Sequence, residues 1–373
     1  MTDATAISRQ LAAILDCFER SGFARREPRL LQPAGVFLDR SGEDFRGRLY
    51  LTSDASGAEL CLRPEYTIPI CLDYLAAGAS GPAAFAYGGS IFRAPEHGAS
   101  GDAELLQAGI ESFGRVDREA ADTEILAAAL EAAQAAGAPP LTVRMGDAGL
   151  VAAFLDGLDL PPAWRRRVVA GHARGQSPAE LFGAPRPAAV ADDQSGVLTA
   201  LTRVDPADAR RLVEDLLSIA GIAAVGGRSA AEIAERFLEQ ATLAEGDAVP
   251  AEKRRLAEAF FAIEGSPDAA SRALRRLATD ARLDLSAALD CLDARAGFIA
   301  ARGLPLDDMF FSASFARQLD YYSGFVFEAR RRGSDTPVIG GGRYDRLLKT
   351  LGASDDIPAV GAAIWVERLG GAS

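Results

Sequence analysis

The feature that most constrains the fold is a change of pattern along the chain. Residues 1–145 and 304–373 contain short runs that alternate apolar and polar side chains, whereas 146–303 contain alanine-rich, leucine-spaced segments with few strand signals. Strand-like regions on both sides of a helical one predict one sheet domain that is interrupted and then resumed. We expect an α+β fold, a mostly antiparallel sheet flanked by helices, with a helical insertion domain at 146–303.

Local patterns place the elements of the sheet domain. Apolar residues at helical spacing from Ile7 to Phe18 predict a helix that ends before Gly22, and the runs GRLYLTSD and AELCLRPE predict an antiparallel hairpin around ASG. A second helix is expected to begin near Thr67. The other predicted elements are strands near 84–94 and 104–114, a helix near 118–136, and strands in LTVRM, DMFFSAS, YYSGFVFEA and IPAVGAAIWVERL.

The composition argues against two classes of partner. A net charge of −12 opposes binding to a phosphate backbone, so we expect no nucleic-acid partner. The longest uncharged stretch, 74–92, is broken by glycines and Pro82, and the N-terminal MTDATAISRQ lacks the basic residues of a signal peptide. We therefore expect a cytoplasmic protein with no membrane partner.

Metal and cofactor sites lack their usual residues. The four cysteines form no C-x-x-C pair and only His97 and His172 accompany them, so we interpret the cysteines as reduced core residues and expect no metal. The two lysines, Lys253 and Lys349, follow no glycine-rich loop, which leaves neither a Walker-type phosphate site nor a Schiff base. We expect no cofactor.

Four polar residues point to a ligand site at one rim of the sheet. Glu65 and Thr67, in LRPEYT, lie where a strand ends and a helix begins, so both side chains project from the same rim. The structural alternative is a helix cap with an Arg63–Glu65 pair. Gln107 and Glu111 share one face of the predicted strand 104–114, and burying them would require a polar ligand unless that face is exposed.

The segments RQLDYYSG and GGGRYD add three tyrosines beside two arginines and two aspartates, namely Arg317, Asp320, Arg343 and Asp345. Arg317 offers a planar fork for a carboxylate, and Tyr321, Tyr322 and Tyr344 offer rings with hydroxyl groups. The triple glycine 340–342, expected just before a helix, forms either a tight turn or a place where a ligand approaches the backbone. Together these residues suit a small ligand with an acid group and a planar ring.

In this order the motifs resemble the catalytic core of histidyl-tRNA synthetase, a class II aminoacyl-tRNA synthetase. The resemblance covers about residues 5–145 and 305–369. It runs through EPRLLQP, LRPEYT, FRAPEH with QAGIESFG, RQLDYY, GGGRYD and AVGAAIWVERL. It implies a class II synthetase-like core in two parts, 1–145 and 304–373, that dimerises near Pro28.

The resemblance also implies a histidine pocket. Glu65, Thr67 and Gln107 match residues that hold the amino group of histidine, and Arg317 matches the arginine that faces its carboxylate. Around the imidazole, the matching residues are Glu111, Tyr322 and Tyr344, and Tyr321 belongs to the same motif. Such a set satisfies every polar end of histidine, and no catalytic residue is predicted.

The nucleotide half departs from the synthetase pattern. Arg93 and Arg368 match, but Pro95 and Leu105 replace a glutamate and an adenine-stacking phenylalanine, and Trp365 replaces a small glycine. The connecting loop carries acidic residues instead of cations, namely Glu96, Asp102 and Glu104. Exchanging a cation for an anion beside a triphosphate reverses about 4 kcal/mol per close pair. Trp365 is expected to fill space that the nucleotide needs.

These departures are similar to those of the regulatory subunits of ATP phosphoribosyltransferase, paralogues of histidyl-tRNA synthetase. Tyr66, at a usual glycine of the synthetase, favours the same family, and so does the expected lack of an anticodon-binding domain after Arg368. The resemblance implies a non-catalytic subunit that joins a short-form catalytic subunit in a hetero-oligomer containing a homodimer. There it would activate that subunit and convey feedback inhibition by histidine, its small-molecule effector.

Two alternatives remain open at this point. The first is an amino-acid-activating enzyme related to histidyl-tRNA synthetase, which Arg93, Arg317 and Arg368 favour because they match catalytic positions. The second is a scaffold whose pocket is a relic and binds no amino acid. Histidine-dependent pyrophosphate exchange separates the first from a regulatory subunit, and histidine binding separates the second.

Overall fold

The computed structural model describes residues 4–38, 46–78, 81–95, 101–183, 211, 215, 224–225, 228–229, 249–317 and 321–370. The chain divides into two compact units. The first comprises residues 1–157, 173–175 and 260–373, and the second comprises 158–172 and 176–259. Helices α13 (Pro267–Ala281) and α14 (Ser286–Ala301) lie inside the predicted insertion 146–303 but belong to the first unit, because they pack on each other, on α5 and on β11.

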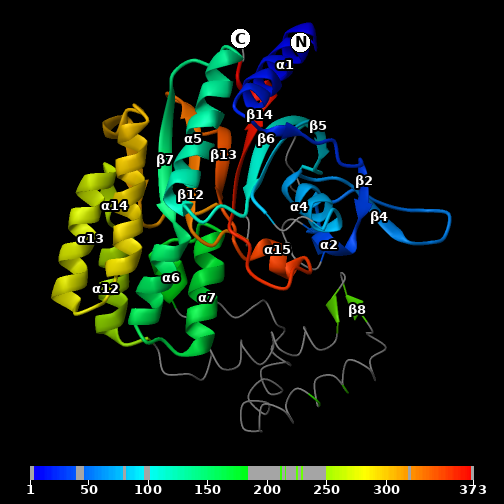
Figure 1. Ribbon diagram of the computed structural model, residues 1–373. Helices are drawn as coiled ribbons and strands as arrows, with labels where there is room; N and C mark the ends of the chain where they lie inside the picture. The colour runs from blue at the N-terminus through cyan, green and yellow to red at the C-terminus, as the bar shows by residue number, and fades with distance from the viewer. Residues whose placement is uncertain are drawn as a thin grey trace. The chain divides into compact units, whose positions relative to one another are not determined.

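A nine-stranded sheet forms the centre of the first unit (Figure 1), in the order β1-β5-β6-β14-β13-β12-β7-β11-β10. Neighbouring strands are antiparallel except for β1 with β5 and β7 with β11, so the predicted mostly antiparallel sheet is confirmed. The strands are β1 (Ala24–Arg25), β5 (Ala83–Phe92), β6 (Glu104–Phe113), β7 (Leu141–Asp147), β10 (Glu264–Gly265), β11 (Met309–Ser312), β12 (Phe325–Arg331), β13 (Pro337–Arg343) and β14 (Ala359–Trp365).

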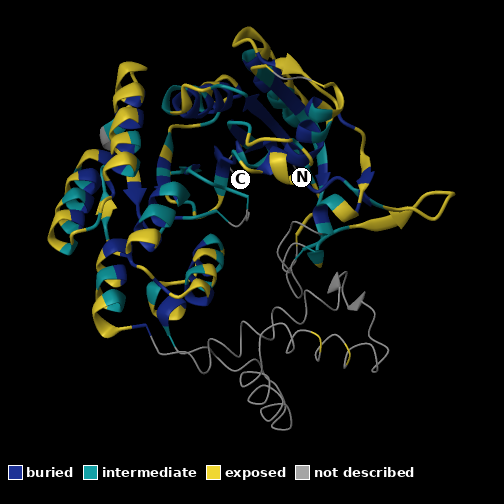
Figure 2. Ribbon diagram, turned by 60° about the horizontal axis from the view of Figure 1, so that its bottom comes forward, coloured by how far each residue is buried: buried dark blue, intermediate teal, exposed yellow. Residues whose placement is uncertain are grey.

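Helices α1 (Ala4–Arg20) and α5 (Arg118–Ala135) pack on each other and on the central strands. The alanines of α5 allow this close approach, since most of its inward residues are small and fully buried. Figure 2 shows the sheet mostly in the dark blue of buried residues, with exposed residues on the outer sides of the helices.

A buried cluster of charged residues, the salt-bridge cluster, joins α5 to α14 and to the sheet. Asp122 of α5 is fully buried and lies 3.0 Å from Nε of Arg295 and 2.7 Å from Nη2 of Arg343. Arg295 also contacts Asp147 at 3.1 Å, and Arg343 contacts Asp345 at 2.8 Å. Paired charges of both signs satisfy one another here, as burial requires.

A smaller layer covers one end of the large sheet. It contains α4 (Thr67–Ala76), α15 (Leu347–Thr350), the short helix α2 (Gly35–Leu38) and a three-stranded sheet in the order β2-β4-β3. Its strands are β2 (Leu31–Pro33), β3 (Leu51–Ser53) and β4 (Glu59–Leu62). Tyr74 packs against Phe85 and Phe113 and so joins α4 to the large sheet.

The remaining described elements of the first unit are α6 (Ala148–Gly157) and the 3₁₀ turns Leu306–Asp308 and Val366–Arg368. In the second unit α7 (Pro162–Ala173) precedes α8 (Pro178–Phe182), whose start is fixed by a capping box of Ser177 and Glu180. Further elements are α12 (Ala251–Phe261), β8 (Ala224–Val225) and β9 (Arg228–Ser229). Among the described residues no helix is long and apolar enough to cross a membrane.

Two local predictions are wrong. The triple glycine 340–342 is the middle of strand β13, not a turn before a helix, because each glycine pairs with residues of both β12 and β14. Tyr321 and Tyr322 precede β12, which begins only at Phe325, so the predicted strand in YYSGFVFEA starts later than expected. The predicted opening helix, the hairpin, and the strands near 84–94 and 104–114 are confirmed.

Candidate functional site

Glu111 of β6 is the centre of a buried polar cluster. Its Oε1 accepts hydrogen bonds from the hydroxyl groups of Thr67 at 2.7 Å and Tyr87 at 3.3 Å, and its Oε2 accepts one from Tyr344. We call Thr67, Tyr87, Glu111 and Tyr344 the pocket cluster. Glu111 is 1% exposed, so the predicted alternative of an exposed strand face is wrong.

Burial dominates the acidity of Glu111. It raises the pKa of the carboxyl group from 4.5 to about 8, although the hydroxyl groups of Tyr344, Thr67 and Tyr87 oppose that rise. Among the described residues, this carboxyl group accepts hydrogen bonds from three hydroxyl groups and forms no ion pair. At neutral pH the group is therefore mostly protonated, and a ligand that donates an N–H hydrogen bond or carries positive charge favours its ionised form.

Glu65 lies at the start of α4, close to the pocket cluster. Its two carboxylate oxygens accept hydrogen bonds from the backbone N–H groups of Thr67 at 2.7 Å and Ile68 at 2.8 Å. The predicted helix cap is therefore confirmed. Arg63 donates instead to the carbonyl groups of Ser90 and Pro28. These two backbone groups, and not the Glu65 carboxylate of the alternative interpretation, fix the position of its guanidinium.

Gln107 lies on β6, two residues before Gly109 and on the same face of the strand. It is 3% exposed, and the strand register places it opposite Gly89 of β5 and Trp365 of β14. Gln107 and Glu111 therefore point to the same side of the sheet. Gln107 lies toward Trp365, and Glu111 lies toward α4 and Tyr344.

Glycines in the sheet create the space for this site. A Cβ atom on Gly361 would collide with the Glu111 carboxylate, and one on Gly340 would collide with the Arg317 guanidinium. Between them, a Cβ on Gly342 would lie 2.8 Å from the ring of Tyr322. Gly340 and Gly342 are two residues apart on β13 and share a face, so the glycines form a floor on which these side chains lie.

Three tyrosines close one side of the pocket cluster. The ring of Tyr321 lies 5.0 Å from that of Tyr322 and 5.6 Å from that of Tyr344. Burial raises the pKa of all three phenols, and Glu111 adds to that rise. At neutral pH each hydroxyl group is therefore a neutral donor, able to donate to a carboxylate or an imidazole nitrogen.

Arg317 lies on the other side of Tyr322. Its Nη1 is 3.4 Å from the carbonyl oxygen of Phe327 and 4.0 Å from the carboxylate of Glu328, both longer than good charged contacts. Its guanidinium charge also lowers the pKa of Tyr322, although burial outweighs that effect. Arg317 also hydrogen-bonds to Tyr322, so a ligand carboxylate could replace the two long contacts and leave the tyrosine contact in place.

The structure therefore brings the eight predicted residues together on one face of the sheet and on the segments that cover it. Thr67, Glu111 and Tyr344 share hydrogen bonds, and Tyr321 and Tyr322 pack beside them. Glu65 lies next to Thr67. Gln107 and Arg317 lie toward Trp365, whose ring centre is 5.8 Å from the Arg317 guanidinium carbon.

The side chains that the sequence resemblance assigns to the nucleotide half make contacts within the protein. Trp365 is 7% exposed, and the guanidinium carbon of Arg368 lies 4.7 Å from its ring centre. Arg368 donates to the carbonyl of Pro337 at 3.0 Å, and Arg93 donates to that of Pro64 at 2.6 Å. Asp102 and Glu104 are exposed, whereas Glu96, His97 and Asp320 lie outside the described residues.

Tyr87 is the residue of the pocket cluster that the sequence patterns did not single out. It lies on β5 opposite Gly109, and a Cβ on Gly109 would collide with its hydroxyl group. The sequence signal that could have identified Tyr87 was Gly109, because a glycine lets a large side chain of one strand extend across its neighbour. Tyr87 reaches Glu111 because Glu111 is two residues further along β6.

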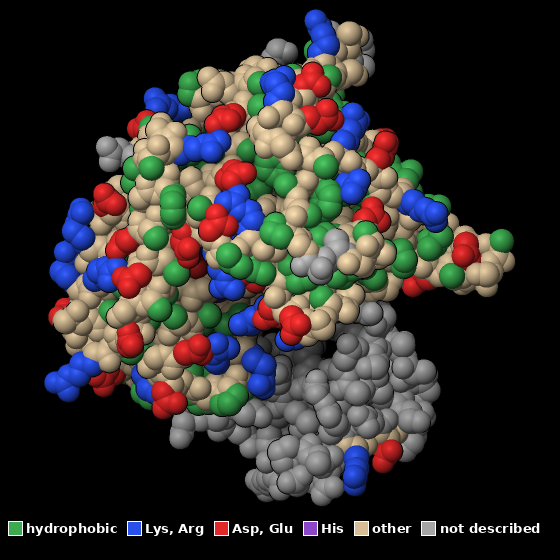
Figure 3. Space-filling view, in the orientation of Figure 1, with side chains coloured by type: hydrophobic (Ala, Val, Ile, Leu, Met, Phe, Trp, Pro, Cys, Tyr) green, Lys and Arg blue, Asp and Glu red, His purple; other side chains and the backbone are tan. Residues whose placement is uncertain are grey.

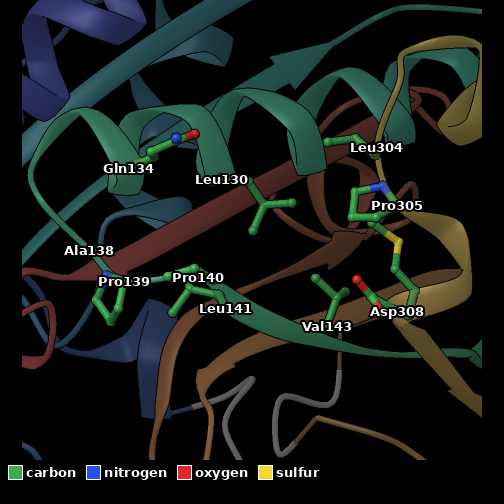
Figure 4. A pocket seen from close by; sticks show the side chains of 11 residues that line it. Leu130, Gln134, Ala138, Pro139, Pro140, Leu141, Val143, Leu304, Pro305 and Asp308 are labelled. Carbon is green, nitrogen blue, oxygen red and sulfur yellow. The ribbon is translucent and has the colours of Figure 1, made fainter.

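One cavity of the first unit, about 270 Å³ in volume, is lined by residues of α5, β7 and the segments beside them (Figure 4). Leu130 and Gln134 of α5 line it with Pro139, Val143 and Pro305. Its walls are mostly apolar, and it contains none of the eight predicted site residues. Within the described ranges no cluster of histidine, cysteine or carboxylate side chains has the arrangement of a metal site.

The comparisons with known proteins agree on one family. The histidyl-tRNA synthetase family model matches residues 2–209 and 170–369. Curated relatives from Brucella canis and Brucella suis, both named ATP phosphoribosyltransferase regulatory subunit, are 42% identical over 347 residues. Each match covers 91% of this chain and 90% of the relative.

Solved structures share the fold. A protein from Bacillus halodurans described as an ATP phosphoribosyltransferase regulatory subunit/histidyl-tRNA synthetase has a TM-score of 0.66 at 18% identity, over 99% of this chain and 80% of that one. A histidine–tRNA ligase subunit from Alicyclobacillus acidocaldarius has a TM-score of 0.59 at 26% identity, over 99% of this chain and 94% of that one. The fold is therefore the class II synthetase-like α+β fold.

Proposed function

The chain belongs to the family of ATP phosphoribosyltransferase regulatory subunits, and on that premise we propose that it activates a short-form catalytic subunit and senses histidine. In this function the chain has no aminoacylation activity of its own. It conveys feedback inhibition by the end product at the first step of histidine biosynthesis. Coupling of this kind is reciprocal, so assembly with the catalytic subunit changes histidine affinity by the same factor as histidine changes assembly.

The pocket cluster is the single observation that supports histidine as the effector. Glu111 and Tyr344 would satisfy the imidazole with Tyr322 and Tyr321, whereas Glu65, Thr67 and Gln107 would hold the ammonium group. Arg317, whose contact with Glu328 is long, would bind the carboxylate of histidine. A pocket that hydrogen-bonds each end of its ligand rejects analogues, because they leave its buried groups unpaired.

The environment of Trp365 supports a regulatory role over a catalytic one. Its ring lies against the guanidinium group of Arg368, which the resemblance assigns to the nucleotide half, and reaches toward Arg317, which it assigns to the histidine carboxylate. Arg93 and Arg368 donate to backbone carbonyls of the chain itself. A nucleotide would have to displace both the indole and these hydrogen bonds.

The arginines also support a second candidate, an amino-acid-activating enzyme. Burial lowers the pKa of Arg93 and of Arg368, and the charge of Arg317 adds to both effects, which places three guanidinium groups in one region. Histidine-dependent exchange of pyrophosphate into ATP would establish that enzyme. We expect no exchange above the rate of a chain in which Arg317 is replaced by alanine.

A homodimer within the hetero-oligomer is part of the proposal. The segment after Pro28 exposes Leu30 at 43% and Leu31 at 46%, an apolar surface next to the motif through which class II cores dimerise. The face shown in Figure 3 carries acidic and basic side chains interspersed among the described residues, without a broad basic patch. That distribution supports a protein partner over nucleic acid.

Co-purification with a short-form catalytic subunit tests the function. We expect a stable complex whose phosphoribosyltransferase activity exceeds that of the catalytic subunit alone and falls when histidine is added. Glu111→Gln is expected to retain the complex and its activation but to weaken inhibition. A complex that forms but responds to histidine equally in the wild type and in Glu111→Gln would place the effector elsewhere.

A further inference from the structure

Tyr66, the residue immediately before α4, has an aromatic side chain that is held from two sides. The Arg63 guanidinium carbon lies 4.2 Å from the centre of the Tyr66 ring. The ring of Tyr87 is stacked on it at 4.4 Å with an interplanar angle of 12°. Both neighbours cannot occupy one face of a ring at these distances, so the Tyr66 ring lies between them.

This stack is continuous with polar contacts at both of its ends. At one end, Arg63 donates from Nη1 to the carbonyl oxygen of Pro28 at 2.7 Å and from Nε to that of Ser90 at 2.8 Å. At the other end, the Tyr87 hydroxyl group donates to Glu111 at 3.3 Å. An unbroken series of contacts therefore joins the chain at Pro28 to the carboxylate of the pocket cluster.

The ring of Tyr66, and not its hydroxyl group, makes these contacts. The hydroxyl oxygen is buried and has no hydrogen-bond partner among the residues that the structure describes. It points at Gly89, where an added Cβ atom would lie only 2.5 Å from it. An unpaired buried hydroxyl group is unfavourable, so the contribution of Tyr66 to these contacts comes from its ring.

We propose that Tyr66 is a positioning residue for the pocket cluster, which fixes the Tyr87 hydroxyl group on Glu111 and ties that contact to the chain at Pro28. The proposal rests on the proposed function only in taking the pocket cluster as the ligand site. Tyr66 stands where the sequence resemblance to the synthetases leads one to expect a glycine.

The geometry explains why Tyr87 depends on this support. Its bond to Glu111 is 3.3 Å long, whereas that of Thr67 is 2.7 Å, so the Tyr87 bond is the weaker of the two. Tyr87 crosses the strand at Gly109, which has no side chain to hold its ring. Without the Tyr66 ring, one face of Tyr87 loses its packing and the hydroxyl group is free to move away from Glu111.

The titration of Glu111 in the unliganded chain reports this contact directly. The titratable groups that face this carboxyl group are Glu65, Cys71, Tyr87, Tyr321, Tyr322 and Tyr344. The phenols and the thiol have pKa values raised by burial and stay neutral below pH 8, and Glu65 is common to every variant. Burial is the largest cause of the raised Glu111 pKa, and reduced burial in Tyr66→Ala would lower the midpoint. A rise of the midpoint that Tyr87→Phe reproduces therefore reflects the loss of a hydrogen-bond donor.

The experiment is a pH titration of ¹³Cδ-glutamate signals, with Glu111 assigned from Glu111→Gln. Tyr66→Ala and Tyr87→Phe are each expected to raise the Glu111 midpoint by roughly one pH unit. Tyr66→Phe keeps the ring and is expected to leave the midpoint unchanged. The double variant Tyr66→Ala/Tyr87→Phe is expected to shift no further than either single variant, because both remove the same contact.

Tyr66→Met, which conserves more volume, replaces Tyr66→Ala if the alanine variant does not fold. Equal Glu111 midpoints in the wild type and in Tyr66→Ala, or in Tyr66→Met, would overturn the proposal. So would additive shifts in the double variant, since they would mean that Tyr66 acts without Tyr87.

A histidine titration separates this inference from the proposed function. If Tyr66 positions Tyr87, Tyr66→Ala is expected to weaken histidine binding several-fold and Tyr66→Phe is not. Absence of histidine binding in the wild type, with the Glu111 shifts as expected, would contradict the proposed function and leave the positioning role intact. Unchanged histidine binding in Tyr66→Ala, with equal Glu111 midpoints, would overturn the positioning role alone.

Discussion

Two buried polar clusters lie on opposite faces of the same sheet and balance their charge in different ways. The salt-bridge cluster pairs Asp122 with Arg295 and Arg343, so its charges are satisfied within the protein. The pocket cluster surrounds Glu111 with three hydroxyl groups. Gly342 and Arg343 are adjacent on β13 and therefore face opposite sides of the sheet. Gly342 faces the pocket cluster, and Arg343 belongs to the salt-bridge cluster.

The difference indicates which cluster is built for a ligand. A network of matched ions is complete, and any ligand that entered it would have to break an ion pair. Glu111, by contrast, is held by neutral donors that can rotate, and its pKa of about 8 means that a cationic or N–H-donating ligand favours the charged form. The salt-bridge cluster therefore holds the fold, and the pocket cluster is available for binding.

The largest expected effect is on stability, from the salt-bridge cluster. Arg295→Met leaves Asp147 and part of Asp122 buried without a cation, so the free energy of unfolding is expected to fall by about 3–5 kcal/mol. Denaturant unfolding measures this loss. The matched control is Arg275→Met, which removes pairs with Asp290 and Asp293 on an exposed helix face and is expected to cost less than about 1 kcal/mol. Equal losses in both variants would contradict a structural role for the buried cluster.

The next effect is a pH dependence that belongs to the pocket cluster. The folded-state pKa of Glu111 is raised, so between about pH 4.5 and pH 8 the folded chain holds a proton that the unfolded chain has lost. Stability is therefore expected to fall as pH rises through this window, by up to about 1.4 kcal/mol per pH unit. Unfolding measured at several pH values should show a shallower slope in Glu111→Gln. Identical slopes would mean that Glu111 titrates normally.

A smaller effect is expected at Thr67, whose hydroxyl group donates to Glu111. Thr67→Val preserves the shape of the side chain but removes this donor, and histidine affinity is expected to fall roughly five- to tenfold. Thr67→Ser keeps the hydroxyl group and is expected to stay within about twofold of the wild type. Calorimetric titration with histidine compares the three chains. A serine variant as weak as the valine variant would argue that packing, not the hydrogen bond, is what matters at this position.

The sequence predicted the sheet well because its strands alternate clearly and its turns carry strong signals. The strand Glu104–Phe113 with Gln107 and Glu111 on one face is an example, and so is the hairpin that ends at Leu62. The triple glycine was misjudged because glycines favour turns by conformation alone. Here they lie in a central strand, since Arg317 and Tyr322 must lie flat on it.

The sequence predicted which residues form the site but not which of them contact one another. Residues such as Glu65 and Arg317 were identified because their motifs resemble those of a known family. Tyr87 and the Asp122–Arg295 pair were not, since their partners are remote in sequence, Glu111 being 24 residues from Tyr87 and Arg295 173 residues from Asp122. Contacts of that kind are set by strand register and helix packing, which local patterns do not encode.

The most direct test of a histidine-sensing pocket is a calorimetric titration of the chain with histidine, in the wild type and in Arg317→Ala. We expect one saturable site in the wild type. Loss of the planar cation opposite the ligand carboxylate is expected to weaken binding on the order of 100-fold. Wild-type affinity retained in Arg317→Ala would contradict the assignment of this pocket.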